Sequence, residues 1–173
     1  MNWTKISVFL LLLIAINPLI MSGLGALENG GIYHFRCMGH IEGNRWLDGV
    51  TQENRVWLAP TTTGGYTGTN WQAIEVEPGV YHLKCLGHIE GNRWLDGVTQ
   101  ENRVWLAPTT TGGYTGTSWQ AIEVEPGIYH LKCLGHIEGN RWLDGVTQEN
   151  RVWLAPTTTG GYTGTSWQAI KVG

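Results

Sequence analysis

The sequence carries little charge and no strong excess of either sign. Lysine and arginine total 11 and aspartate and glutamate total 14 among its 173 residues, which leaves a formal net charge of −3. Proteins that bind nucleic acid or anionic lipid usually present a basic patch. The composition therefore favours neither a nucleic acid nor a membrane surface as a partner.

Long apolar runs are absent except for one near residue 1. Lys5 precedes an apolar run from Ile6 to Ile16, and Pro18 and the letters SGLGA follow it. This order is typical of a secretory signal peptide, and the run is shorter than the ~20 apolar residues of a membrane span. We expect residues 1–26 to be a cleaved signal peptide, with a signal anchor as the alternative. Residues 27–173 would then form a single secreted, soluble domain.

Cysteine is scarce, and its three copies occupy equivalent positions. Cys37, Cys85 and Cys133 recur at intervals of 48 residues. Export permits disulfides, but three equivalent thiols cannot all pair within one chain. We expect buried thiols that act as small apolar residues. One intermolecular pair with a thiol left over, or a three-cysteine metal site on a threefold axis, are the alternatives.

Helical periodicity and catalytic motifs are also missing. No segment of the mature chain has an apolar repeat of 3.6 residues long enough for a helix. There is no Ser/His/Asp order, no glycine-rich phosphate loop and no complete metal-ligand set, and Glu42 with Asp48 is at most an unplaced carboxylate pair. We therefore expect no enzyme and no cofactor.

What the chain does contain is a threefold internal repeat. Residues 31–78, 79–126 and 127–173 align without a gap, and the eighteen letters GNRWLDGVTQENRVWLAP occur unchanged in each. A core tolerates substitution when volume and pattern are kept. Identity that includes loop residues indicates either recent duplication or one surface that is needed three times.

Each repeat predicts four short strands, over residues 32–37, 45–48, 55–59 and 71–76 of the first copy. Tyr33, Phe35 and Cys37 alternate with polar residues, and Gly, Asn and Thr fill the stretches between the strands. The predicted core also contains the following residues: Trp46, Leu47, Val56, Leu58, Trp71, Ile74 and Val76. On the fourth strand Trp71 and Ala73 lie on one face and Ile74 and Val76 on the other, and a β-bulge after Ala73 would reconcile the two.

Twelve strands in three equal units predict an all-β fold of the β-trefoil type. The alternative is half of a six-bladed β-propeller formed by a dimer, because propellers also use four strands per unit but need at least four blades. The motifs Gly-x-Tyr-x-Leu-x-Cys, Trp-Leu-Asp-Gly, Val-x-Leu and Gly-Thr-x-Trp, in this order, resemble β-trefoil lectins, in outline the ricin-B-type family. The resemblance covers the whole mature chain and implies a trefoil that binds sugars.

In that family an aspartate at the end of the second strand accepts hydrogen bonds from sugar hydroxyls, which the resemblance places on Asp48. An Asp-Gly pair is equally typical of a tight hairpin turn, so Asp48 has two interpretations. The family's aromatic residue on the third strand falls on Ala59, and its Gln-x-Trp motif is replaced by Thr69-Asn70-Trp71.

An aromatic side chain is available nearby. Trp57 lies between Val56 and Leu58, so it points outward if they point into the core. It would stack on a sugar ring beside polar groups of the same repeat, or it is covered by the loop that follows. The candidate carbohydrate-binding residues are Asp48, Asn54, Trp57 and Tyr66, with their equivalents Asp96, Asn102, Trp105, Tyr114, Asp144, Asn150, Trp153 and Tyr162.

The polar loop GHIEGN supplies a second rank of candidates. These are His40, Asn44, His88, Asn92, His136 and Asn140. A His-x-Glu pair is too small a set to predict a metal site. The leading functional hypothesis is a secreted, multivalent lectin with up to three equivalent sites and glycans or glycoproteins as partners. A trefoil protease inhibitor and a non-catalytic structural or interaction module are the alternatives.

Overall fold

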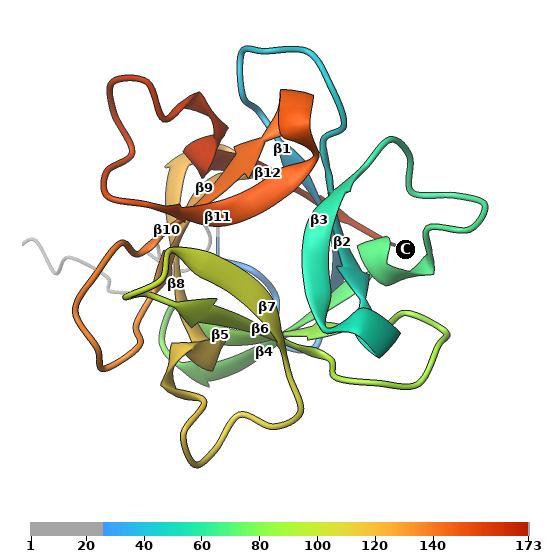
Figure 1. Cartoon of the computed structure of the whole chain (residues 1–173), viewed down its shortest axis with the longest axis vertical. Helices are drawn as coiled ribbons and strands as arrows, with labels where there is room; N and C mark the ends of the chain where they lie inside the picture. Colours follow the sequence, from blue (N-terminus) through green and yellow to red (C-terminus); the bar gives the residue numbers. More distant parts are fainter. Residues whose placement is uncertain (1–25, 173) are drawn as a thin grey trace, which may run out of the picture.

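The computed structural model describes residues 26–172, which form an all-β fold with twelve strands in one closed, barrel-like sheet (Figure 1). Each repeat supplies four strands. The strands of the first repeat are β1 (Ile32–Cys37), β2 (Trp46–Val50), β3 (Arg55–Ala59) and β4 (Trp71–Glu77). Those of the second are β5 (Val80–Cys85), β6 (Trp94–Val98), β7 (Arg103–Ala107) and β8 (Ser118–Glu125). Those of the third are β9 (Ile128–Cys133), β10 (Trp142–Val146), β11 (Arg151–Ala155) and β12 (Ser166–Lys171).

The first and fourth strands of the repeats close into a ring. Strand β4 pairs with β1 and β5, β8 with β5 and β9, and β12 with β9 and β1, all antiparallel. The ring closes within one chain because the last strand pairs with the first. A closed ring leaves none of its strands with an unpaired edge.

The second and third strands form three hairpins beside the ring: β2–β3, β6–β7 and β10–β11. Strands β3, β7 and β11 also pair with one another, through Arg55 opposite Trp105, Arg103 opposite Trp153 and Arg151 opposite Trp57. Figure 1 shows these three strands around the centre of the view, so they surround the pseudo-threefold axis.

Most of the predicted strands are confirmed, and the second one is shifted. The predicted strands 32–37 and 55–59 match β1 and β3, whereas β2 continues through Asp48 and Gly49 to Val50. The chain reverses later, at Thr51–Glu53 and Asn54, which has φ 56° in the left-handed region. The interpretation of Asp48-Gly49 as the hairpin turn is therefore wrong. Residues 26–172 contain only three-residue 3₁₀ turns and no helix long and apolar enough to cross a membrane.

The core contains most of the side chains that alternation predicts, with two corrections. Phe35, Leu47, Leu58 and Trp71 are fully buried, and Trp71 donates its indole N–H to the Leu47 carbonyl at 2.9 Å. Trp46 is only half-buried, with its ring edge-on to His34 at 6.0 Å between centroids. Val76 is 44% exposed, because the bulge lies between Glu75 and Glu77 and leaves Val76 without a pairing partner on β5. The predicted bulge after Ala73 is thus displaced along the strand, and Ile74 is half-buried.

The three cysteines are free, fully buried thiols, as the apolar interpretation predicts. Cys85 Sγ lies 3.6 Å from the Gly49 carbonyl oxygen and 3.5 Å from that of Gly68, both in the preceding repeat. Desolvation by burial raises the pKa of the Cys85 and Cys133 thiols to about 11. Each thiol therefore packs at a separate seam between repeats, and within residues 26–172 no group of three His, Cys, Asp or Glu side chains could hold a metal ion.

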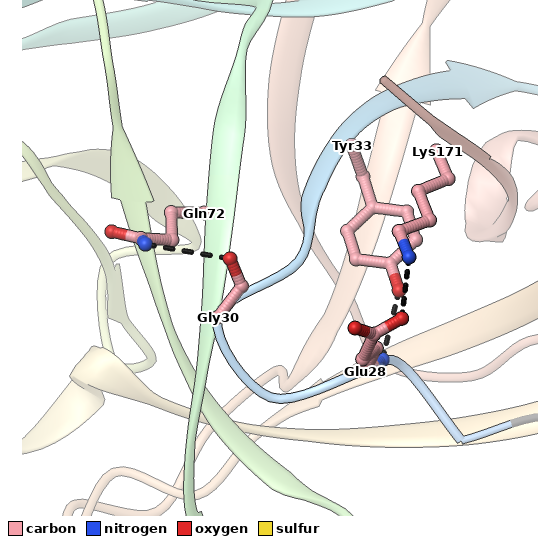
Figure 2. Close-up of polar contacts among 5 residues, drawn as sticks. All are labelled: Glu28, Gly30, Tyr33, Gln72 and Lys171. Atoms are coloured by element: carbon pink, nitrogen blue, oxygen red, sulfur yellow. Dashed lines mark hydrogen bonds and ion pairs between the residues drawn. The ribbon is translucent and has the colours of Figure 1, made fainter. Parts of the chain in front are cut away.

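The residues before β1 pack against the ring. The predicted signal peptide, residues 1–26, lies outside the described residues except for Ala26, but Leu27 is only 3% exposed and belongs to the core. The Tyr81 hydroxyl donates to the Leu27 carbonyl at 2.8 Å. Figure 2 shows Glu28 held by the Tyr33 hydroxyl and by Lys171 of β12. These contacts join the beginning of the domain to its last strand.

Candidate functional site

An aspartate and a tryptophan face each other on every hairpin. The β2–β3 register places Asp48 opposite Trp57, and the Trp57 indole N–H donates to Asp48 Oδ2 at 2.6 Å. The equivalent bonds are 2.5 Å between Trp105 and Asp96 and 2.6 Å between Trp153 and Asp144. Val56 and Leu58 are buried and Trp57 is half-buried, so the predicted outward direction of Trp57 is confirmed. The hydrogen bond fixes the plane of a partly exposed ring.

The aspartate itself is almost inaccessible. Asp48 is 4% exposed, and its Oδ1 is buried and has no hydrogen bond of good geometry within the described residues. Burial raises the pKa of the Asp48 carboxyl above its ordinary value, and the Trp57 hydrogen bond and the neighbouring Gly68 amide lower it in part. A Cβ on Gly68 would lie 2.7 Å from this Oδ1, which shows how closely the backbone covers it. Asp48 therefore orients Trp57 and offers little to a ligand in this conformation.

Three equivalent pockets adjoin these Asp–Trp pairs. Their volumes are about 200 Å³ beside Asp48 and about 190 Å³ beside each of Asp96 and Asp144. Trp57 and Tyr66 line the first pocket together with Gln52 and Thr67. The structure thus brings together three of the four predicted residue types, Asp, Trp and Tyr, in each repeat.

The fourth predicted type lies elsewhere. Asn54 is exposed, occupies the left-handed turn of the hairpin, and accepts a backbone hydrogen bond from Leu106 of the next repeat at 3.1 Å. Asn54 and Asn102 line a different cavity, on the pseudo-threefold axis. The backbone carbonyl of Asn150 accepts the equivalent bond, from Leu58, at 3.0 Å. The asparagines therefore serve the hairpin turn and the seam between repeats.

Each pocket is completed by the GHIEGN loop of the next repeat around the ring. Thr51 donates its hydroxyl to the Ile89 carbonyl at 2.6 Å, and the His88 amide lies 3.2 Å from Thr67 Oγ1. The His136 amide likewise lies 3.3 Å from Thr115 Oγ1 in the second repeat, but the histidines themselves lie outside the residues that line the three pockets. His40 in the same way adjoins the pocket of the third repeat, through Thr163 at 3.4 Å.

The asparagines of the second rank do not reach the pockets. Asn44, Asn92 and Asn140 are half-buried and lie outside the sets of residues that line the three pockets. The loop therefore contributes its backbone and its isoleucine to each pocket.

The sequence interpretation missed the isoleucine of this loop. Ile41, Ile89 and Ile137 are 52–53% exposed, and each lies in the wall of one pocket. An isoleucine within an otherwise polar loop, GHIEGN, was the pattern that could have identified it. Gln52 and Thr67 were also missed, because nothing distinguishes a loop glutamine or threonine by letter alone.

No protein-family model matches this sequence, and no curated protein matches it. The geometry of the pockets therefore carries the functional argument.

Proposed function

We propose that this protein is a secreted, multivalent carbohydrate-binding protein in which each of the three pockets accepts one sugar residue. The observation that carries the proposal is the threefold recurrence of one pocket with a fixed, partly exposed tryptophan in its wall. An exposed aromatic surface that recurs at three places is typical of an interaction site. Agreement of the three volumes supports sites of equal affinity.

We also assign the domain to the β-trefoil fold, of the outline found in ricin-B-type lectins. A ring of first and fourth strands with three hairpins at one end supports this assignment. In a propeller each four-strand unit would keep its own sheet. The extensive pairing of β4 with β5 and of β8 with β9, between repeats, argues against that alternative.

The chemistry of each pocket suits a sugar. The Trp57 ring offers an apolar surface to the C–H face of a pyranose, and Ile89 extends this surface from the neighbouring repeat. The Gln52 amide and the Tyr66 hydroxyl supply donors and acceptors for sugar hydroxyls. Asp48 acts through Trp57, which it orients, so its role differs from that of the aspartate implied by the lectin resemblance.

Three sites explain how weak pockets could be useful. A pocket of about 200 Å³ is small, and open, shallow sites bury little ligand surface. Linking three of them on one rigid domain raises the apparent affinity for a surface that displays many copies of the ligand, by about 10²–10⁴ when the geometry allows simultaneous contact. The proposal therefore predicts weak binding of free sugars and strong binding of glycan-coated surfaces.

A glycan array followed by titration tests the proposal. We expect the mature protein to bind a defined set of glycans and to bind the free sugar at three sites per chain. Replacement of Gln52, Gln100 and Gln148 together by alanine should weaken binding, because these exposed side chains line the pockets. The matched control replaces three glutamines of the ring strands, Gln72, Gln120 and Gln168. Absence of binding to every glycan, or equal loss in both variants, would refute the proposal.

A further inference from the structure

A larger cavity lies on the pseudo-threefold axis, next to the three pockets, and Trp105 and Trp153 line both this cavity and a pocket of their own repeat. Its volume is about 710 Å³, within the range of about 300–1,000 Å³ that is usual for small-molecule sites. It is lined by the first residues of β3, β7 and β11, the strands around the centre of Figure 1, and by turn residues of the first two repeats. All three repeats contribute to one cavity, so the chain has one such site.

Three arginines, one from each repeat, line this cavity: Arg55, Arg103 and Arg151. Each guanidinium makes an ion pair with the glutamate two residues earlier, at 2.7, 2.6 and 3.0 Å. Each also lies over the tryptophan ring of its own strand, with its central carbon 5.4, 5.4 and 4.9 Å from the ring centroid. The arginines are thus held in place before a ligand arrives, which lowers the entropic cost of binding.

The arginines keep donors available for a ligand. Their side chains are 54–57% exposed, and the ion pair involves one terminal nitrogen, Nη2, of each guanidinium. A guanidinium has five N–H donors in a planar fork, so several remain free. The valines that line the cavity, Val56, Val104 and Val152, are 4–8% exposed.

We propose that the axial cavity is a fourth binding site, one per chain, for a sulfate or phosphate monoester such as a sulfated or phosphorylated sugar. The three terminal oxygens of a monoester are related by a threefold axis along the ester bond. An ester group on the pseudo-threefold axis presents one oxygen to each arginine, and its organic part points toward solvent. Arginine is the side chain best suited to such oxyanions.

The glutamates make this proposal specific. Three carboxylates compensate the three guanidinium charges and repel an incoming anion. Salt should weaken binding of the ester, because the arginine charges lie near the surface and are screened. Removal of the carboxylate charges should strengthen anion binding, whereas a purely structural role of the ion pairs predicts no gain in affinity.

Calorimetric titration of the mature protein tests the site directly. The probes are galactose 6-sulfate, galactose 6-phosphate, unmodified galactose and inorganic sulfate, at an ionic strength of about 0.01 M, where screening is weak. We expect one molecule of either ester per chain, competition by inorganic sulfate, and no binding of galactose to this site. The two ester arms show whether the natural group is a sulfate or a phosphate. Binding of neither ester would overturn the proposal.

Two triple variants and one double variant separate charge from structure. Arg55→Gln, Arg103→Gln and Arg151→Gln together should raise the Kd of the ester at least about tenfold, which corresponds to about 1.4 kcal/mol. Glu53→Gln, Glu101→Gln and Glu149→Gln together should lower it. The control, Lys84→Gln with Lys132→Gln, removes two cations that lie over Trp94 and Trp142 outside the cavity and should change nothing.

Two results would contradict the site even if an ester binds. One is a stoichiometry of three per chain, which would assign binding to the three pockets. The other is an unchanged Kd in the arginine variant when thermal unfolding shows that this variant is folded. Replacement of Gln52, Gln100 and Gln148 by alanine, which alters the three pockets, should leave ester binding intact. The axial site and the proposed lectin activity can therefore fail independently.

Discussion

The buried thiols predict a specific loss of stability at alkaline pH. The pKa of the Cys85 and Cys133 thiols is raised by burial from 9.0 to about 11, whereas in the unfolded chain both have their ordinary value. Between these two values the native state keeps protons that the unfolded state loses. The stability that these groups contribute is therefore complete below pH 9 and is lost as the pH rises toward 11.

The size of the effect follows from the two pKa values. One pKa unit corresponds to about 1.4 kcal/mol, so each thiol lowers the free energy of unfolding by roughly 1–2 kcal/mol at pH 10 and by about 3 kcal/mol well above pH 11. Cys85 and Cys133 together should lower the free energy of unfolding by about 3 kcal/mol at pH 10. The pKa of Cys37 is also raised by burial, so Cys37 adds a loss in the same direction.

Urea unfolding followed by tryptophan fluorescence, with a reducing agent, measures this effect between pH 7 and pH 10. The reference is the variant Cys37→Ala, Cys85→Ala and Cys133→Ala, which retains Tyr81 and Tyr129, whose raised pKa values act in the same direction. We expect wild type to lose about 3 kcal/mol more than the variant. Parallel curves for the two proteins would refute the argument, as would rapid reaction of the native thiols with a thiol reagent at pH 8.

Three further predictions concern particular side chains of the fold. Gly49→Ala should destabilise the domain by about 1–3 kcal/mol, because the added Cβ would lie 2.7 Å from the Cys85 thiol of the next repeat. Gly65→Ala is the control: the added Cβ meets open space there, so the melting temperature should change little. The triple variant Asp48→Asn, Asp96→Asn and Asp144→Asn tests the raised carboxyl pKa. As the pH falls from 7 toward 4, wild type should gain stability relative to this variant, because only wild type has carboxyl groups at these positions that take up protons on folding. An identical pH dependence of the two unfolding curves would contradict this. Tyr81→Phe should lower the free energy of unfolding by about 1–3 kcal/mol, since it leaves the buried Leu27 carbonyl without its donor, and an unchanged urea midpoint would show that the bond contributes nothing.

Alternation of side chains was enough to locate most strands and the core of the ring. Tyr33, Phe35 and Cys37 are buried on β1 as expected, because in a closed ring one face of every strand is covered. The exceptions have local causes. Trp46 begins a hairpin strand and lies against His34, where it is only half-buried. Val76 lies in a β-bulge, and the residue pattern does not predict at which position of the strand the bulge occurs.

The composition of the pockets could be predicted only in part, because the stretches that line the pockets have the same sequence in every repeat. Asp48 and Trp57 are brought together by the hairpin of their own repeat, which alternation and register can predict. His40 is close to Asp48 in sequence, yet it adjoins the pocket of the third repeat. When three copies are alike, the letters do not tell which copy lies beside which, so the rotation by one repeat around the axis is information that only the fold contains.

The same rotation gives a physical reason for the eighteen unchanged residues. Within this stretch Gly49 packs against Cys85, the Asn54 carbonyl accepts the Leu106 amide, and Thr51 bonds to the Ile89 carbonyl, each a contact with the next repeat. A substitution in one copy is therefore met by unchanged partners in another, and neighbouring residues couple in their effects on stability. Contacts between copies thus oppose their divergence, whatever recent duplication and repeated ligand binding also contribute.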